Sequence, residues 1–278
     1  MLRAVEHIRP MKGGAQSHLL RADDGHYYVV KFQNNPQHRR VLANEYIAAR
    51  LAQWLALPVP PCDLIEVPAS LIAGSPELVL RVAGEALRCS AGLQFASRLP
   101  CADPHAPIFD YLPDAGLDLV ANLRDFAGML CFDKWTCNCN GRQVIFCRPH
   151  PRRPMRVFMI DQGFCFNAGD WNFPDSPLRG VYSRNQVYQA VRGWDSFAPW
   201  LARIEQCPEE VIYSCGEHVP PEWYGSWDDL ERLLRQLAQR RERLRDLLAA
   251  VRASVRNPFP QWRDDVPATI SLAAGAGD

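Results

Sequence analysis

The sequence lacks a long apolar run, although apolar residues make up 47% of its 278 positions. No uninterrupted apolar stretch approaches the ~20 residues that a membrane-spanning helix needs. The N-terminal segment, MLRAVEHIRPMKGG, also lacks the apolar core of a secretion signal. We therefore expect a cytoplasmic protein without a membrane partner, long enough for one large domain or for two parts that share a cleft.

Neither sign of charge is in excess, since lysine and arginine together number 31 and aspartate and glutamate also number 31. This balance argues against a protein that binds nucleic acid mainly through bulk positive charge. A local basic groove is compatible with it, but direct nucleic-acid binding is not indicated. The oligomeric state does not follow from the composition.

Ten cysteines are present, but the spacing of a common zinc site is absent. Cys131, Cys137, Cys139 and Cys147 are separated by five, one and seven residues, which matches no usual zinc pattern. Without an export signal, reduced thiols are favoured over disulfides. We expect buried thiols, and the alternative is a metal–thiolate protein, which metal analysis of the purified protein would reveal.

The sequence also lacks an internal repeat. Its first part is rich in strand patterns and carries one helix. An Asp-Gly turn between 18–22 and 26–33 predicts a hairpin. Apolar residues at helical spacing from Val41 to Leu55 predict a helix that Pro58 terminates. Further strands are expected at 62–68, 76–82 and 93–98.

A loop rich in proline and aspartate follows and is a possible hinge. Beyond it, 120–135 predicts a buried helix, and QVIFCR and RVFMID predict two strands around an arginine- and proline-rich turn. The last segments are helical, ending in one long amphipathic helix at 227–255, and TISLAAGAGD is expected to be loose. The order predicts an α+β fold with a small β-rich part (1–98) and a larger, mostly helical part (99–278).

That order is the layout of a two-lobed phosphotransferase, which needs a loop that covers phosphates. The segment MKGGAQS, with Gly13, Gly14, Ala15 and Gln16, lies between two strand-like segments, where such a loop belongs. An ordinary hairpin turn would use the same two glycines, and the GxGxxG pattern is absent.

A lysine on a strand and a glutamate on the next helix are the second and third requirements. Lys31 stands among apolar residues in VVKF, where an inward lysine is costly without a partner. Glu45 follows fourteen residues later in the predicted helix. Strand alternation would also allow Lys31 to face water, and a surface carboxylate near a helix start is common.

A metal-binding turn and a catalytic loop are the last requirements. Asp161-Gln162-Gly163 follows the strand RVFMI and places a carboxylate in a turn. Asp133 and Asn138 stand five positions apart, which is the interval in the kinase loop H-R-D-x-x-x-x-N. Either motif alone is weak, but their order along the chain favours a kinase.

At these residues the sequence resembles the HipA-like serine/threonine kinases over roughly residues 5 to 260. GGAQSH resembles the family's glycine loop, ANEYIAARLAQWLALPVP its glutamate helix, FDKWTCNCNGRQ its catalytic loop, and MIDQGFCFN its metal turn. The resemblance implies a protein-kinase-like bilobal fold and an activity that uses ATP and Mg²⁺, acting on serine or threonine of a protein substrate.

One position departs from the family's loop pattern, N-x-D-x-H-x-x-N, in which the aspartate is the base. Asn140 stands at that aspartate here, and an amide cannot accept a proton as a carboxylate does. The later asparagine falls on Ile145, which cannot hold a metal. Either Asp133 serves as base with Asn138 on the metal, or Gln143 takes the place of the metal-binding asparagine, or the protein is a weak or inactive kinase.

The leading hypothesis is an ATP- and Mg²⁺-dependent phosphotransferase. In it, the loop from Gly13 to Gln16 covers the phosphates, Lys31 contacts them and Glu45 orients Lys31. Asp161 and Asn138 hold the metal, and Asp133 is the base. The alternative is a pseudokinase that binds nucleotide without phosphotransfer, for which Asn140 is the main indication.

Overall fold

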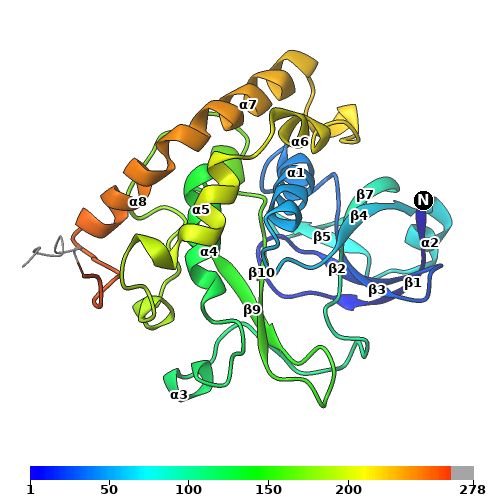
Figure 1. Cartoon of the computed structure of the whole chain (residues 1–278). Coiled ribbons are helices and arrows are strands. Elements are labelled where there is room, and N and C mark those ends of the chain that lie inside the picture. The colour runs from blue at the N-terminus through cyan, green and yellow to red at the C-terminus, as the bar shows by residue number, and fades with distance from the viewer. Residues whose placement is uncertain (264–278) are drawn as a thin grey trace, which may run out of the picture.

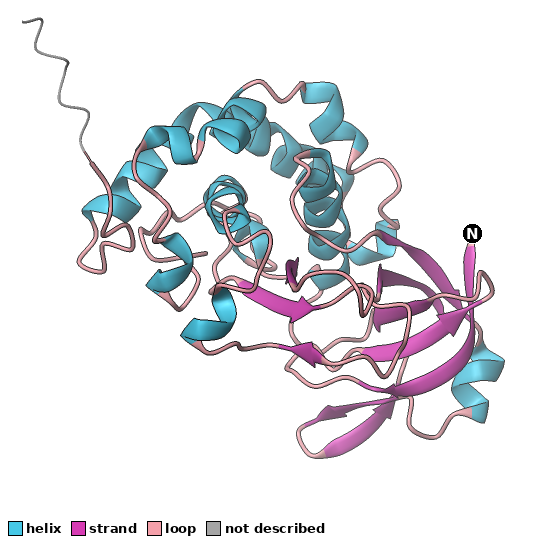
Figure 2. Ribbon diagram, turned by 60° about the horizontal axis from the view of Figure 1, so that its bottom comes forward, coloured by secondary structure: helices cyan, strands magenta, loops and turns pink. Residues whose placement is uncertain are grey.

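A computed structural model of the chain describes residues 1–263. Strands gather at one end of the molecule and helices at the other (Figure 2). The chain builds the strand-rich end first, and the later part is mostly helical (Figure 1). The mixed content and the strand-rich N-terminal part that the sequence predicts are therefore confirmed.

Five strands of the N-terminal part close into a barrel in the order β1-β2-β3-β7-β4. Neighbouring strands run antiparallel except β1 and β4, which close the barrel in parallel. Leu20, Val30 and Ile65 are among the residues that fill its interior, because alternate side chains of a strand point to the same face. The elements of this part are β1 (Leu2–Pro10), β2 (His18–Ala22), β3 (Tyr27–Lys31), α1 (Val41–Trp54), β4 (Cys62–Val67), α2 (Ala69–Gly74), β5 (Val79–Val82), β6 (Glu85–Arg88) and β7 (Gly92–Arg98).

The predicted hairpin is confirmed in β2 and β3, which pair with His18 opposite Val30. The predicted helix is confirmed in α1, which ends before Pro58. Although α1 belongs by sequence to the strand-rich part, its buried residues join the core of the helical part and not the core of the barrel. The helix therefore connects the barrel strand that carries Lys31 to the rest of the molecule.

The hairpin of β9 (Gln143–Cys147) and β10 (Arg156–Ile160) confirms the two strands expected around the arginine- and proline-rich turn. A short strand, β8 (Ile108–Phe109), pairs with β9 and completes a three-stranded sheet. The buried helix expected from Val120 is α4 (Asp125–Trp135), which starts later because Val120 bridges to Met155 and 121–124 forms a turn.

The long C-terminal helix expected at 227–255 is two helices, which corrects that prediction. A 3-10 turn at 241–243 separates them, and the arginines at the junction are bound to neighbouring segments: Arg240 donates to the carbonyl oxygen of Trp135 at 2.9 Å, and Arg241 to that of Cys207. TISLAAGAGD lies outside the described residues. The remaining helices are α3 (Asp114–Leu117), α5 (Ala198–Glu205), α6 (Glu209–Ser214), α7 (Trp227–Arg240) and α8 (Leu244–Ala253).

The ten cysteines are free thiols, and all except the half-buried Cys62 and Cys139 are buried, as expected. Within residues 1–263, no three His, Cys, Asp or Glu side chains are grouped as a metal site would require. None of the helices in this part of the chain is long and apolar enough to cross a membrane.

Candidate active site

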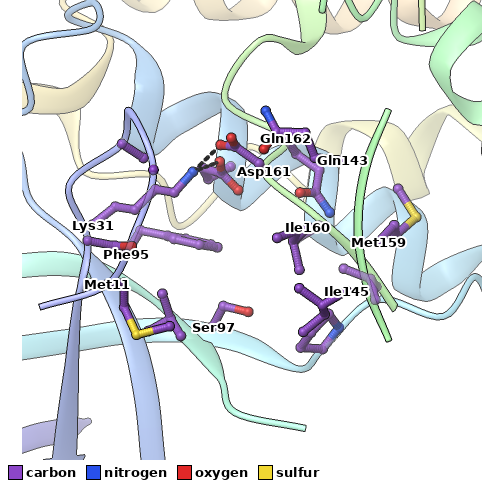
Figure 3. A pocket seen from close by; sticks show the side chains of 18 of the residues that line it. Met11, Lys31, Phe95, Ser97, Gln143, Ile145, Met159, Ile160, Asp161 and Gln162 are labelled. Carbon is purple, nitrogen blue, oxygen red and sulfur yellow. Dashed lines mark hydrogen bonds and ion pairs between the residues drawn. The ribbon is translucent and has the colours of Figure 1, made fainter. Parts of the chain in front are cut away.

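A cavity of about 370 Å³ lies between the barrel and the β9–β10 hairpin. The 11–17 loop, β3 and β7 form one wall, and β9, β10 and the turn after β10 form the other (Figure 3). One end is charged and the other is mostly apolar. The cavity collects segments from both halves of the sequence, so tertiary folding alone creates it.

Lys31 occupies the charged end, with 8% of its side chain exposed. Its ammonium group forms ion pairs with the carboxylates of both Glu45 and Asp161 (Figure 3). Burial by itself would lower the pKa of Lys31, but the two carboxylates outweigh burial and raise it. Lys31 therefore carries a full charge at neutral pH and faces the cavity, which rules out the alternative that it points to water.

Glu45 comes from α1 and is 2% exposed. Its carboxylate also accepts a hydrogen bond from the backbone N–H of Gly163, at 2.8 Å. Burial raises the pKa of Glu45, and the charge of Lys31 opposes that rise. A Cβ atom at position 163 would lie 2.7 Å from Val41 and 3.2 Å from the Glu45 carboxylate, so only glycine allows this close approach.

Asp161 stands at the end of β10 with a φ of 60°, in the left-handed region that few non-glycine residues adopt. Such backbone strain is concentrated at functional sites. Burial alone would raise the pKa of Asp161, but the Lys31 ammonium outweighs it and holds that pKa below the ordinary value. The carboxylate is therefore ionised, partly exposed to the cavity and able to accept a cation.

Asn44 fixes the turn that follows Asp161. Its side-chain amide donates to the carbonyl oxygens of Gly163, Cys165 and Ala168 at 2.8 to 2.9 Å, and its oxygen accepts from the Trp171 indole at 2.7 Å. The side chain is fully buried. One residue of α1 thus holds the turn while the next, Glu45, holds Lys31.

The 11–17 loop lies over the charged end, and Gly13, Gly14 and Ala15 contribute to the cavity wall. Gly13 has a φ of 115°, which favours glycine. Gln16 does not line the cavity, which corrects its expected place: its side chain pairs with the backbone of Arg81 in β5, and its N–H donates to Gly13. Ser17 lines the wall instead.

Asn140, in the loop before β9, and Gln143, the first residue of β9, line the cavity, and both are exposed. Gln143 lies on the opposite wall from Lys31, close to Gln162 (Figure 3). Gln143, which one reading of the sequence sets in the place of the metal-binding asparagine, therefore reaches the cavity.

Asp133 and Asn138 are not at the cavity. Asp133 is 1% exposed, and its carboxylate is bound by the Arg142 guanidinium and by the Asn138 amide at 2.9 Å. The side chains of Asp133 and Arg142 are both fully buried. Asp133 therefore has no access to a substrate hydroxyl, and Asn138 has none to a cation at Asp161, so both expectations are corrected.

A divalent cation fits the residues at the charged end. Asp161 supplies an ionised carboxylate and Gln143 an amide oxygen, and oxygen ligands of this kind are what Mg²⁺ and Mn²⁺ take in proteins. The ion pair with Lys31 holds the Asp161 carboxylate in place. These two residues are the ones that would hold the cation.

Three residues at or near the site were not predicted from the sequence: Asn44, Arg142 and Ser97. An asparagine inside an apolar helix pattern is a weak indication that the Asn44 side chain is buried and makes hydrogen bonds. The sequence gives no indication of the role of Arg142, because its partner Asp133 is nine residues away and the pairing depends on the loop between them. It gives no indication of the role of Ser97 either, because its contact with the cavity follows from the register of β7.

Residues 4–143, just over half of the chain, match the sequence model of the HipA-like kinase family. No curated protein sequence matches the chain. The match ends at Gln143, so it includes the glycine loop, Lys31 and Glu45 and excludes Asp161.

Several solved kinase structures are similar in fold. The Helicobacter pylori proinflammatory kinase CtkA is 15% identical, with a TM-score of 0.57 over 90% of this chain and 97% of that one. Hydra Fam20 with sugar is 10% identical, with a TM-score of 0.55 over 96% and 90%. The Golgi casein kinase with Mn/ADP bound is 12% identical, with a TM-score of 0.51 over 91% and 74%. At these identities the likeness concerns the fold alone.

Proposed function

Because this chain belongs to the HipA-like kinase family, we propose that it is an ATP-dependent phosphotransferase that uses a divalent cation, Mg²⁺, and acts on serine or threonine of a protein. In this proposal a β-rich lobe (1–98) and a helical lobe (99–278) enclose the nucleotide in the cavity between them. The observation that carries the proposal is the cluster of Lys31, Glu45 and Asp161 at the charged end of that cavity.

Each residue has a role that its position supports. Backbone N–H groups of Gly13, Gly14 and Ala15 cover the phosphates. Lys31 neutralises the negative charge of the phosphates, and Glu45 keeps the Lys31 side chain extended. Asp161 and Gln143 would hold the cation, which would supply positive charge to shield the transferred phosphoryl group. Asn140 accepts a hydrogen bond from the substrate hydroxyl and orients it.

No unpaired carboxylate lines the cavity in residues 1–263 to accept the proton of that hydroxyl. Of residues 1–263, only Glu45 and Asp161 bring carboxylates to the cavity wall, and both are paired with Lys31. The hydroxyl proton then leaves to water or to the transferred phosphoryl oxygens, and positioning and charge supply the rate. The absence of a positioned base typically lowers the reaction rate by roughly a hundred- to ten-thousand-fold.

Calorimetric titration of the full chain with ATP, with and without Mg²⁺, tests the nucleotide site. We expect Mg²⁺ to strengthen ATP binding in the wild type and to have no such effect in Asp161→Asn. Asp246→Asn, on the exposed face of α8, is the matched control and should behave as the wild type. Equal enhancement by Mg²⁺ in Asp161→Asn and wild type would remove Asp161 from the cation site.

The second candidate function is nucleotide binding without phosphotransfer, and Asn140 at the cavity favours it. Transfer of labelled γ-phosphate to the protein itself or to lysate proteins separates the two candidates. We expect slow transfer by the wild type and a rate at least tenfold higher in Asn140→Asp, since the new carboxylate can accept the proton. ATP binding with no transfer by either protein would establish the binding function instead.

A further inference from the structure

The apolar end of the cavity forms a slot between the barrel wall and the hairpin wall. Val29 and Phe95 of the barrel line one side of it. Ile145 and Ile160 of the β9–β10 hairpin lie on the wall opposite Phe95 (Figure 3). Lys31 pairs with Phe95 and Val29 pairs with Ser97, so this end begins two strand positions, about 7 Å, beyond the lysine. If the phosphates lie at Lys31, as the proposed function requires, the nucleobase lies here.

The chain that leaves β7 along this slot offers no free backbone N–H. The N–H of Arg98 donates to the Pro61 carbonyl and that of Leu99 to the Tyr27 carbonyl, each at 2.8 Å. Pro100, the next residue on the cavity wall, has no N–H at all. A base that needs a donor from this segment therefore cannot obtain one from the backbone.

The same segment does offer a backbone acceptor. In an antiparallel pair, two opposite residues exchange both hydrogen bonds, so the N–H of residue 61 would donate to the Arg98 carbonyl. That residue is proline, and the returning bond cannot form. The Arg98 carbonyl is thus left without its partner in the sheet, beside Pro60 and Val59 of the cavity wall.

Ser97 supplies the donor that the backbone lacks. It is half-buried, its hydroxyl points into the cavity (Figure 3), and that hydroxyl makes no hydrogen bond within the part of the chain that the structure describes. The neighbouring Arg98 guanidinium is turned towards the His26 ring, at 2.9 Å, and is not directed at the slot. A hydroxyl both donates and accepts, so it can meet either kind of ring atom.

We infer that the cavity recognises the base of its nucleotide through the Ser97 hydroxyl and the Arg98 carbonyl in place of a backbone N–H, which makes Ser97 a specificity-determining residue. This inference rests on the proposed function. Adenine suits the pair, because its 6-amino group donates to the carbonyl and a ring nitrogen accepts from Ser97. The 6-oxygen of guanine would face the carbonyl oxygen and be repelled.

Calorimetry in Mg²⁺ with three ligands tests the inference: ATP, purine riboside triphosphate, which lacks the 6-amino group, and inorganic triphosphate, which lacks the base. Loss of one hydrogen bond predicts ATP binding about two- to tenfold weaker in Ser97→Ala than in the wild type. Inorganic triphosphate should bind both proteins equally. Purine riboside triphosphate should bind more weakly than ATP to both, because the Arg98 carbonyl loses its partner.

Ser97→Thr, which keeps the hydroxyl, should retain wild-type preference for ATP over inorganic triphosphate. Ser70→Ala, at an exposed position of α2, is the matched control. Unchanged ATP affinity in Ser97→Ala, or an equal loss for inorganic triphosphate, would overturn the role of Ser97 and leave the proposed function standing. Equal binding of ATP and purine riboside triphosphate by the wild type would overturn the role of the carbonyl. Failure of the wild type to bind any of the three would overturn the proposed function and this inference together.

Discussion

The carboxylate of Asp133 is held by Arg142 and Asn138 with both members of the ion pair out of contact with water. Removing one member of a buried pair leaves the other charge uncompensated and costs about 3–5 kcal/mol. We predict that Asp133→Asn lowers the free energy of unfolding by roughly this amount, measured by urea denaturation. Asp118→Asn, which is exposed, should change it by about 0.5 kcal/mol or less.

The folded fraction of Asp133→Asn should bind ATP as the wild type does, because Asp133 does not touch the cavity. Asp133→Leu combined with Arg142→Met removes both charges and should be more stable than Asp133→Asn. A stable Asp133→Asn protein that binds ATP normally but has lost all phosphotransfer would restore Asp133 as the base.

Lys31 also stabilises the molecule, because it separates two carboxylates with little access to water. In Lys31→Met, Glu45 and Asp161 face each other without a cation, so their pKa values in the folded state rise above those in the unfolded chain. A raised folded pKa means that the folded state binds more protons, so stability increases as the pH falls. We predict that the melting temperature of Lys31→Met lies well below that of the wild type at about pH 8 and that the gap narrows towards about pH 5.

Thermal unfolding followed by circular dichroism across that pH range measures the gap. Lys12→Met serves as the control, since Lys12 is exposed and makes no ion pair among those found within residues 1–263. A gap that is constant or widens on acidification would mean that the carboxylates do not take up a proton when Lys31 is absent.

At the scale of elements, α1 joins the strand that carries Lys31 to the turn that follows Asp161. Asn44 makes four hydrogen bonds to that turn and to Trp171, and a buried bond contributes about 1 kcal/mol. We predict that Asn44→Ala lowers the free energy of unfolding by about 2–4 kcal/mol and weakens Mg²⁺-dependent ATP binding as well. Displacement of the turn moves Asp161 and accounts for the second effect.

Gln53→Ala, exposed on the same helix, is the matched control for Asn44→Ala and should leave both quantities near wild-type values. Calorimetry at a temperature where both variants are folded separates binding from stability. Full Mg²⁺ dependence in Asn44→Ala would show that the turn keeps its position without this anchor.

At the scale of the whole molecule, the barrel core and the helical core are joined through α1 and Phe95, both of which belong to the helical core. We therefore expect a single cooperative unfolding transition. A ligand that binds only the folded state adds about 2.7 kcal/mol at a hundred times its Kd, or roughly 5 °C for a chain of this size. Mg²⁺ and ATP together should raise the melting temperature by that amount.

Far-ultraviolet and near-ultraviolet circular dichroism should report the same midpoint with and without ligand. Asp161→Asn should lose the part of the shift that depends on Mg²⁺. Two separate transitions, of which ATP moves only one, would show that the two cores unfold independently and that the nucleotide contacts one of them alone.

The sequence by itself determined the elements and the chemistry of the charged end. Strand alternation and helical spacing are local patterns, so β2, β3, α1 and the β9–β10 hairpin were predictable from neighbouring residues. Lys31, Glu45 and Asp161 were predictable because each is recognisable within its own short segment. The helix expected at 227–255 was wrong because a continuous leucine stripe does not reveal a one-turn break held by contacts with distant segments.

Only the tertiary structure decided which polar residues of the catalytic loop reach the cavity. Asp133 and Asn140 are seven positions apart, and a pattern of spacing treats both as available. Folding buries the first against Arg142 and exposes the second, because an aspartate loses its access to substrate once a guanidinium occupies both of its oxygens. The register of β7 likewise decides which backbone N–H and carbonyl groups are paired within the sheet. The groups that it leaves unpaired are the ones that a ligand beside β7 can reach.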